Sequence, residues 1–261
     1  MIVTSEYLQS AEFRNSAAAS FEKAIGKFVK GTLVNEERHL YYALARDYYM
    51  GYGSFVELGS FLGASSRAFA AGLRDNPRAR VGRLQCFDLF YYDNSWGQGG
   101  IDSYLTEKEK MDFLACFREN ISGLEQYIDI NQGNILDCTG DSFNEIELLF
   151  VDLAKTPELM LHIGQYFLSR LPEGALYIQQ DYLFDGLPFI KAFHEFFWEY
   201  FEMIEPNAGS TVVFRMRKKF SPTSEHLNAC AKAMSGDDMK QLVVDNGTRF
   251  SDRYQPFFKY A

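Results

Sequence analysis

Short apolar runs alternate with amphipathic stretches through most of the chain after Gly53. Several of these runs, IELLFV and ALYI among them, are nearly continuous, which is typical of strands that helices cover on both faces. This alternation predicts a doubly wound α/β sheet. The expected strands are SFVEL (54–58), RLQCFD (83–88), YIDIN (127–131), IELLFVD (146–152), ALYIQQ (175–180), YFEMIEP (200–206) and STVVFRMR (210–217). The helices expected between them are 64–74, 106–121, 157–171 and 187–199.

The last two expected strands are connected differently from the others. Only Asn207–Gly209 lies between them, which leaves no room for the crossover helix that parallel neighbours need. We therefore expect this pair to be antiparallel. The predicted fold class is a Rossmann-like, doubly wound α/β fold with a seven-stranded sheet whose last strand is antiparallel.

The two ends of the chain lie outside this sheet. Residues 5–50 contain no proline and carry apolar residues at helical spacing, which predicts an N-terminal helical extension. The C-terminal tail is expected to be partly helical around 224–243. The extension and the aromatic segment Tyr254–Tyr260 are candidates for a homodimer interface. The predicted division is an extension at 1–50, a core at 51–220 and a tail at 221–261.

Composition narrows the classes of function. The chain has 261 residues, of which 47% are hydrophobic, so it can bury a full core. Its net charge of −9 disfavours nucleic acid as a partner, because that binding depends on Lys and Arg displacing counterions from phosphates. Neither a membrane-spanning run nor a signal peptide is present in the sequence, so a cytoplasmic location is expected. Scattered spacing favours free thiols over a disulfide framework or zinc site for Cys86, Cys116, Cys138 and Cys230.

The segment VELGSFLGASS (56–66) joins an expected strand to an expected helix. Gly59 and Gly63 leave no side chain between the backbone and a ligand, and the helix that follows offers free N–H groups to a carboxylate. The spacing differs from the dinucleotide pattern G-x-G-x-x-G, because Phe61 stands at its second glycine. A glycine-containing turn alone is a weak signal, since many strand-to-helix turns contain glycine.

This segment resembles the first S-adenosylmethionine (SAM) motif of class I methyltransferases, E/D-x-G-x-x-x-G, in the form found in catechol-type O-methyltransferases. The resemblance covers roughly residues 50–217 and implies SAM as the cofactor. It implies that Glu57 pairs with the cofactor's ammonium group, directly or through solvent, and that Ser65 approaches the same end. The residues expected at this part of the cofactor are Glu57, Gly59, Ser60, Gly63 and Ser65.

Two later segments extend the expected cofactor site. Asp88 ends the second expected strand, where an acidic residue can accept hydrogen bonds from both ribose hydroxyls. The segment GNILD (133–137) resembles the one that lines the adenine pocket in the family. It makes Asn134 and Ile135 candidates, with Ile135 packed on the adenine ring.

The reacting end is expected at FVDLAK (150–155) and IQQDY (178–182). The resemblance implies that Asp152 is a metal-binding and cofactor-binding aspartate and that Lys155 is the catalytic lysine. Asp152, Gln180 and Asp181 form a candidate Mg²⁺ set. Gln180 stands where the family has an aspartate, and its neutral carbonyl is a poorer Mg²⁺ ligand. Metal-dependent and metal-free reactions therefore both stay open.

In a metal-free reaction, a buried Lys155 with a lowered pKa is a candidate base. Asp152 opposes that shift and favours a charged lysine, which would orient the acceptor oxygen or stabilise its negative charge. A surface ion pair is the alternative without a catalytic role. His194 is a further candidate base, because it follows the loop at the expected acceptor mouth.

The acceptor is expected to be enclosed by the loops 89–105 and 183–188 and by parts of the N-terminal helices. Tyr182 fits the D-D-Y strand end of the macrolide and aminocoumarin sugar O-methyltransferases. Aromatic rings in these segments either stack on a sugar or aromatic ring of the acceptor or pin the loops. The substrate candidates are Tyr91, Tyr92, Trp96 and Tyr182.

The resemblance implies an enzyme that methylates a hydroxyl of a small molecule, such as a sugar or secondary metabolite, by in-line transfer from SAM. Methylation of nitrogen or carbon is an alternative. A nucleotide-binding oxidoreductase and a non-catalytic SAM-binding module are alternatives from other classes. The glycine spacing and the reversed last strand argue against the oxidoreductase, and the charged residues at the reacting end argue against the non-catalytic module.

Overall fold

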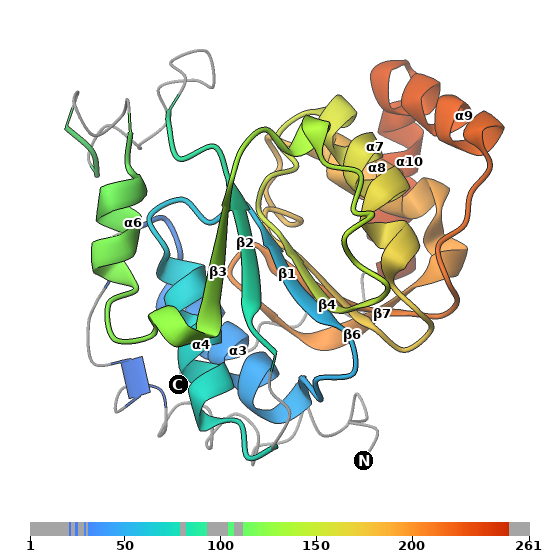
Figure 1. The fold of residues 1–261 in the computed structure, drawn as a ribbon. Helices are drawn as coiled ribbons and strands as arrows, with labels where there is room; N and C mark the ends of the chain where they lie inside the picture. Colours follow the sequence, from blue (N-terminus) through green and yellow to red (C-terminus); the bar gives the residue numbers. More distant parts are fainter. Residues whose placement is uncertain are drawn as a thin grey trace, which may run out of the picture.

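The computed structural model describes residues 21, 24–25, 29, 31–78, 82–92, 104–106 and 112–250 (Figure 1). At residues 205–207 it describes the backbone only. A single mixed sheet forms the centre of the molecule, with helices on both of its faces. The strands are β1 (Ser54–Leu58), β2 (Leu84–Asp88), β3 (Ile128–Gln132), β4 (Ile146–Val151), β5 (Leu176–Gln179), β6 (Phe201–Ala208) and β7 (Thr211–Met216).

The seven strands have the order β3-β2-β1-β4-β5-β7-β6. β1 to β5 are parallel neighbours, whereas β7 runs antiparallel to both β5 and β6. The short turn at Gly209, whose φ is +55°, returns the chain directly from β6 to β7. The predicted seven-stranded Rossmann-like sheet with a reversed last strand is therefore confirmed.

Two hydrophobic layers flank the sheet because its strands alternate their side chains between the two faces. Phe55 and Phe150 face the layer that contains α3 (Asn35–Ala43), α4 (Ala64–Asp75) and α6 (Leu114–Asn120). Val56 and Val151 face the layer that contains α7 (Pro157–Tyr166), α8 (Pro188–Phe196), α9 (Ser224–Ser235) and α10 (Asp238–Phe250). Figure 1 shows α3, α4 and α6 on one side of the sheet and α7, α8 and α10 on the other.

Short helical turns adjoin several of these elements. The π-helical turn η1 (Leu44–Tyr48) continues α3, and the 3-10 turns η6 (Leu168–Arg170) and η7 (Trp198–Tyr200) follow α7 and α8. These breaks shorten the helices that the sequence predicts at 157–171 and 187–199. The turns η4 (Glu125–Tyr127) and η5 (Ile135–Asp137) flank β3.

Both ends of the described chain pack on the core. On the N-terminal side, α3 packs against α4, and Tyr41 and Tyr42 are buried there. On the C-terminal side, α10 packs against α8 and buries Asn246 and Phe250. The helix predicted around 224–243 is two helices and extends to Phe250. The division at 1–50, 51–220 and 221–261 and the homodimer stay predictions, and Tyr254–Tyr260 lie outside the described residues.

Two further features bear on the sequence-based expectations. None of the four cysteines, all in the described part, forms a disulfide. No helix within the described ranges is long and apolar enough to cross a bilayer.

Candidate active site

The turn between β1 and α4 packs directly against the end of β4. Gly59 and Gly63 both have left-handed backbones, with φ of +91° and +85°. A Cβ at Gly59 would lie 3.0 Å from the carbonyl carbon of Asp152, which is closer than ordinary packing allows. The N–H of Gly59 donates to Phe87 O at 2.9 Å, and the N–H of Asp152 donates to Leu58 O at 2.8 Å. Glycine thus brings the ends of β1, β2 and β4 together.

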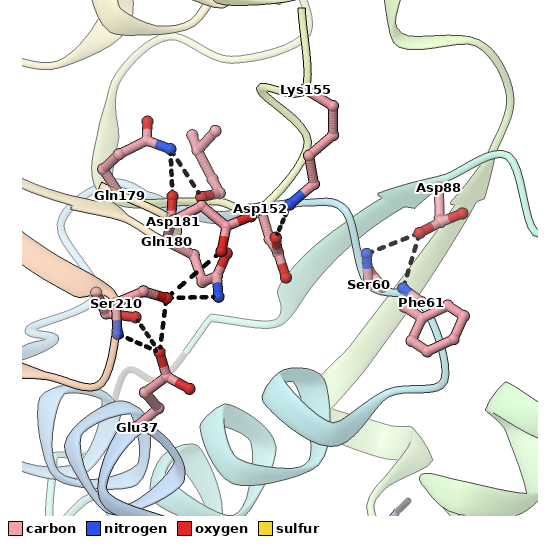
Figure 2. A network of polar contacts seen from close by, with 12 residues as sticks. Glu37, Ser60, Phe61, Asp88, Asp152, Lys155, Gln179, Gln180, Asp181 and Ser210 are labelled. Carbon is pink, nitrogen blue, oxygen red and sulfur yellow. Dashed lines mark hydrogen bonds and ion pairs between the residues drawn. The ribbon is translucent and has the colours of Figure 1, made fainter. Parts of the chain in front are cut away.

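Asp88, at the end of β2, holds this turn by its carboxylate. Its Oδ2 accepts hydrogen bonds from the N–H groups of Ser60 and Phe61, at 2.9 and 2.8 Å, and its Oδ1 accepts from Phe90 N at 2.8 Å. Burial raises the pKa of Asp88, although these hydrogen bonds lower it. The residue that the sequence predicts as a ribose ligand therefore lies beside the glycine turn (Figure 2).

Residues other than glycine that have left-handed backbones lie at the same edge of the sheet. Among the described residues, Phe61, Phe90 and Asp181 are the non-glycine residues with positive φ, at +45°, +57° and +61°. All three follow the carboxyl ends of strands, after β1, β2 and β5 respectively. Such conformations cost energy and cluster at functional sites. These three conformations therefore support the carboxyl ends of the strands as the location of the functional site.

Glu57 is a residue of β1 that contacts the first turn of α4. Its side chain is fully buried and accepts hydrogen bonds from the hydroxyls of Ser65 and Ser66 on α4, at 2.5 and 2.6 Å, and from Cys86 Sγ at 3.0 Å. Burial raises the pKa of Glu57 to about 7. Because Glu57 exposes no surface, it reaches a ligand only if the turn or α4 shifts. In this structure Glu57 and Ser65 support the turn, and their contact with the cofactor stays a prediction.

The segment after β3 lies next to Asp88, since Gly133 N donates to Asp88 O at 3.0 Å. Asn134 uses its side-chain oxygen to cap η5, where it accepts from Leu136 N at 3.0 Å. Ile135 is 4% exposed and belongs to the layer that contains α7 and α8. Leu136 is 37% exposed. The sequence alone does not single out Leu136, which presents more apolar surface than the predicted Ile135.

Three charged side chains meet at the ends of β4 and β5. Lys155 Nζ donates to Asp152 Oδ1 at 2.6 Å and to Asp181 Oδ2 at 2.5 Å. The two aspartate side chains are each 21% exposed, and that of Lys155 is 48% exposed. The structure therefore brings together three of the predicted catalytic and metal-binding residues, at a place that solvent reaches.

The charges of this group depend on one another. Burial raises the pKa of Asp152 to about 6, and repulsion from Asp181 and Asp88 adds to the rise while Lys155 opposes it. Burial lowers the pKa of Lys155, but attraction to Asp152 and Asp181 and the two hydrogen bonds outweigh it, so the net pKa is raised. Lys155 therefore carries a proton at neutral pH. This arrangement argues against Lys155 as a base and supports its alternative role as a charged donor.

The candidate Mg²⁺ set does not fit a metal in this arrangement. The ammonium of Lys155 lies between the carboxylates of Asp152 and Asp181, where a cation would bind. Gln180 Nε2 donates to Ser210 Oγ at 3.1 Å, while its Oε1 is buried without a hydrogen-bond partner. Within the described ranges, no three His, Cys, Asp or Glu side chains group as metal ligands. We therefore derive no step through a metal.

A buried carboxyl that the sequence does not indicate adjoins this group (Figure 2). Glu37, on α3, is 2% exposed and accepts hydrogen bonds from Thr211 Oγ1 at 3.0 Å, Ser210 N at 3.2 Å and Val34 N at 3.0 Å. Burial raises the pKa of Glu37 to about 7, and the charge of Asp152 contributes. The sequence carries no signal for this position, because it arises only when α3 packs across the start of β7.

His194 lies in the hydrophobic core, away from solvent. It is fully buried on α8, and its Nδ1 is 2.7 Å from Ile190 O. Its ring stacks with those of Tyr177 and Phe214, at centroid distances of 5.5 and 4.8 Å. Burial lowers the pKa of His194 to about 4. This position argues against His194 as a base, because the face of α8 that carries it packs on the sheet.

The aromatic candidates for the acceptor fall into different environments. Tyr182 is fully buried, and its hydroxyl donates to Asn246 Oδ1 at 2.8 Å, so it belongs to the core, which argues against the predicted acceptor contact. Tyr91 is 44% exposed, whereas Tyr92 is 9% exposed. Trp96 lies outside the described residues. Tyr91 is therefore the described candidate with the largest accessible ring.

A surface cavity of about 390 Å³ lies at the opposite edge of the sheet, at the amino ends of β1, β4 and β5. Ligands of open α/β sheets bind at the carboxyl ends of the strands, so this cavity does not replace the site described above. Its lining includes Tyr48, Met50, Tyr52, Glu147, Pro172 and Arg215.

Comparison with known families and structures gives concordant results. Residues 56–182 match the family described as "Methyltransferase domain", a span that runs from the glycine turn through Asp181. The O-methyltransferase NovP matches in structure with a TM-score of 0.54 and 13% identity, over 82% of this chain and 100% of that chain. The Podospora anserina methyltransferase PaMTH1 matches with a TM-score of 0.52 and 14% identity, over 79% of this chain and 87% of that chain. At such identities the likeness concerns the fold. No curated protein matches the sequence.

Proposed function

We propose that this chain, whose residues 56–182 match a methyltransferase-domain family, moves the methyl group of SAM onto a hydroxyl oxygen of a small molecule. The observation that carries the proposal is the position of the Lys155–Asp152–Asp181 group beside the glycine turn, through the close approach of Gly59 to Asp152. Methyl transfer needs acceptor oxygen, methyl and sulfur in line, and a single edge of the sheet can hold all three.

The donor fits across the turn between β1 and α4. Gly63 is the N-cap residue of α4, and no side chain there bonds the first N–H groups of the helix. These N–H groups can therefore bind the carboxylate of SAM. Asp88 lies at the end of β2 beside this turn, where its carboxylate is placed to meet a ribose hydroxyl. Leu136, which is 37% exposed, supplies apolar surface for adenine. SAM bound there supplies an electrophilic methyl group on a sulfonium.

The acceptor hydroxyl is placed against the Lys155 group. Asp152, with a pKa of about 6, is suited to accept the hydroxyl proton near neutral pH. The ammonium of Lys155, 2.6 Å from that carboxylate, stabilises the negative charge that develops on the acceptor oxygen. This oxygen attacks the methyl carbon of the sulfonium, and its negative charge and the positive charge of the sulfur disappear together. Partial exclusion of water therefore favours the step.

The rim of the site supports an acceptor with a flat or ring-shaped face. Tyr91 is 44% exposed and Phe184 is 54% exposed, and both follow strands at this edge. Exposed aromatic rings can stack on a sugar or an aromatic ring. The description of NovP as an O-methyltransferase supports oxygen as the methylated atom, and the description of PaMTH1 as bound to S-adenosylhomocysteine (SAH) supports SAM as the donor.

Calorimetric titration with SAM, SAH and NAD tests the donor. We expect SAM and SAH to bind at one site per chain and NAD not to bind, because Phe61 replaces the second glycine of the dinucleotide pattern. Binding of NAD without binding of SAM would overturn the proposal.

A screen with methyl-labelled SAM against sugars, phenols and amines tests the acceptor. A product labelled on oxygen supports the proposed reaction. A product labelled only on nitrogen or carbon would overturn the choice of oxygen and leave the donor in place.

A further inference from the structure

Glu37 on α3 is pressed against the turn between β6 and β7. A Cβ at Gly209 would lie 2.7 Å from Glu37 Oε1, so a larger residue in this turn would displace the carboxyl from its present position. The N–H of Ser210 donates to the same oxygen at 3.2 Å. The contact fixes the place of the Ser210 hydroxyl relative to Glu37.

The Ser210 hydroxyl connects Glu37 to the reacting end of the site (Figure 2). Its oxygen is 3.4 Å from Glu37 Oε1 and also 3.4 Å from Asp181 Oδ1, and it accepts a hydrogen bond from Gln180 Nε2 at 3.1 Å. A serine hydroxyl carries one proton and so donates to one carboxylate at a time. Glu37 and Asp181 therefore compete for a single hydrogen bond at equal distances.

Asp181 depends on such contacts for its orientation. Its backbone is left-handed, with φ of +61°, and its side chain divides its two oxygens between partners. Oδ2 accepts from Lys155 Nζ at 2.5 Å, and Oδ1 faces the Ser210 hydroxyl. Because the two oxygens share one negative charge, a hydrogen bond to Oδ1 draws charge away from Oδ2. A change in that hydrogen bond therefore changes the strength of the ion pair with Lys155.

We propose that Glu37 is a positioning residue that acts through Ser210 on Asp181 and thereby on Lys155. When the carboxylate of Glu37 accepts the hydrogen bond from the Ser210 hydroxyl, Asp181 keeps its full charge for Lys155. When Glu37 does not accept it, the hydroxyl donates to Asp181 instead and weakens the ion pair with Lys155. The N-terminal helix α3 thus takes part in setting the position of the lysine. The inference rests on the proposed function for its catalytic consequence, but the contact itself can be tested without an acceptor.

The first test observes the Lys155 ammonium by NMR in protein labelled with ¹⁵N-lysine, with Lys155→Arg used for assignment. We expect the Nζ signal to shift in Ser210→Ala and in Glu37→Gln. Ser210→Thr keeps the hydroxyl and is expected to restore the wild-type signal. Glu36→Gln, on the same turn of α3, is the matched control and leaves the signal in place. An unchanged signal in Ser210→Ala would overturn the inference.

The second test separates turnover from donor binding. We expect Ser210→Ala to reduce kcat by about tenfold with any acceptor that the labelled-SAM screen identifies, while the Kd for SAM in calorimetry stays within about twofold. The double variant Glu37→Gln/Ser210→Ala should be no slower than the slower single variant, because both act along one route. Additive losses would show that Glu37 acts by another route and overturn the inference.

Two outcomes keep this inference distinct from the proposed function. Failure of the wild-type protein to bind SAM counts against the proposed function, while the NMR comparison still decides whether Glu37 acts on Lys155. If Glu37→Gln fails to fold, Glu37→Asp takes its place, and the comparison of Ser210→Ala with Ser210→Thr decides whether Ser210 acts on Lys155.

Discussion

Lys155 and Asp181 are 26 residues apart in the chain, yet the lysine Nζ lies 2.5 Å from the aspartate Oδ2. The same ammonium lies 2.6 Å from Asp152 Oδ1, so one positive charge bridges the ends of β4 and β5. This bridge keeps the lysine protonated and takes the place of a metal between the two carboxylates. It also ties the chemistry of the site to whatever orients Asp181.

Replacing Lys155 by Met should abolish most of the turnover. The variant loses the charge that stabilises the developing oxyanion, and removing such a group typically costs on the order of 100-fold in kcat. We expect SAM affinity to persist, because the donor site lies at the glycine turn. Initial rates and calorimetry check both points. Lys240→Met, an exposed change on α10, is the control, and equal rates in the two variants would remove Lys155 from the mechanism.

Gly59→Ala should destabilise the protein and weaken SAM binding. An Ala at φ +91° is strained, and its Cβ would lie 3.0 Å from the backbone of Asp152, so we expect a loss of about 1–3 kcal/mol in the free energy of unfolding. Denaturant titration measures this loss.

Gly247→Ala provides the matched control for that change. Gly247 lies in α10, and a Cβ there meets nothing within 4 Å. Alanine in place of a helical glycine should therefore stabilise the protein by about 0.5–1 kcal/mol. A loss of similar size in both variants would contradict the claim that the turn requires glycine.

The free energy of unfolding should fall as the pH rises through neutrality, because buried Glu57 then loses its proton. Burial raises its folded-state pKa to about 7, above the ordinary value of 4.5. The folded state therefore binds the proton more tightly than the unfolded state, and the resulting stability is full below pH 4.5 and is lost as the pH rises through 7. Denaturant titrations between pH 5 and pH 8 should show a smaller decline in Glu57→Gln than in the wild type. Identical declines would mean that Glu57 does not titrate in this range.

Removal of divalent metals should leave methyl transfer unchanged. The ammonium of Lys155 already pairs with both Asp152 and Asp181, and Gln180 turns its amide nitrogen toward Ser210. We expect equal initial rates with EDTA and with added Mg²⁺. A rate that EDTA removes and Mg²⁺ restores would show that Lys155 leaves this position during the reaction.

His194 illustrates the limit of reading a site from residue order. Its place after the loop at 183–188 suggested a base, but a helix that begins at Pro188 turns this residue into the core. Tyr182 is a second example, because its hydroxyl donates a hydrogen bond to Asn246 on α10 in the core. Proximity along the chain does not set the direction of a side chain, because packing selects which face of a helix or turn is buried.

The order of strands and helices, the reversed β7, the glycine turn and the placement of Asp88, Asp152 and Lys155 near one edge were all readable from local patterns. Hydrophobic periodicity and short connections are properties of neighbouring residues, so they survive without knowledge of the fold. The competition between Glu37 and Asp181 for Ser210, the contact of Lys155 with Asp181 and the burial of Glu57 were not readable in this way. Each arises from segments far apart in the chain that packing brings within hydrogen-bond distance, and burial then changes the cost of carrying charge there.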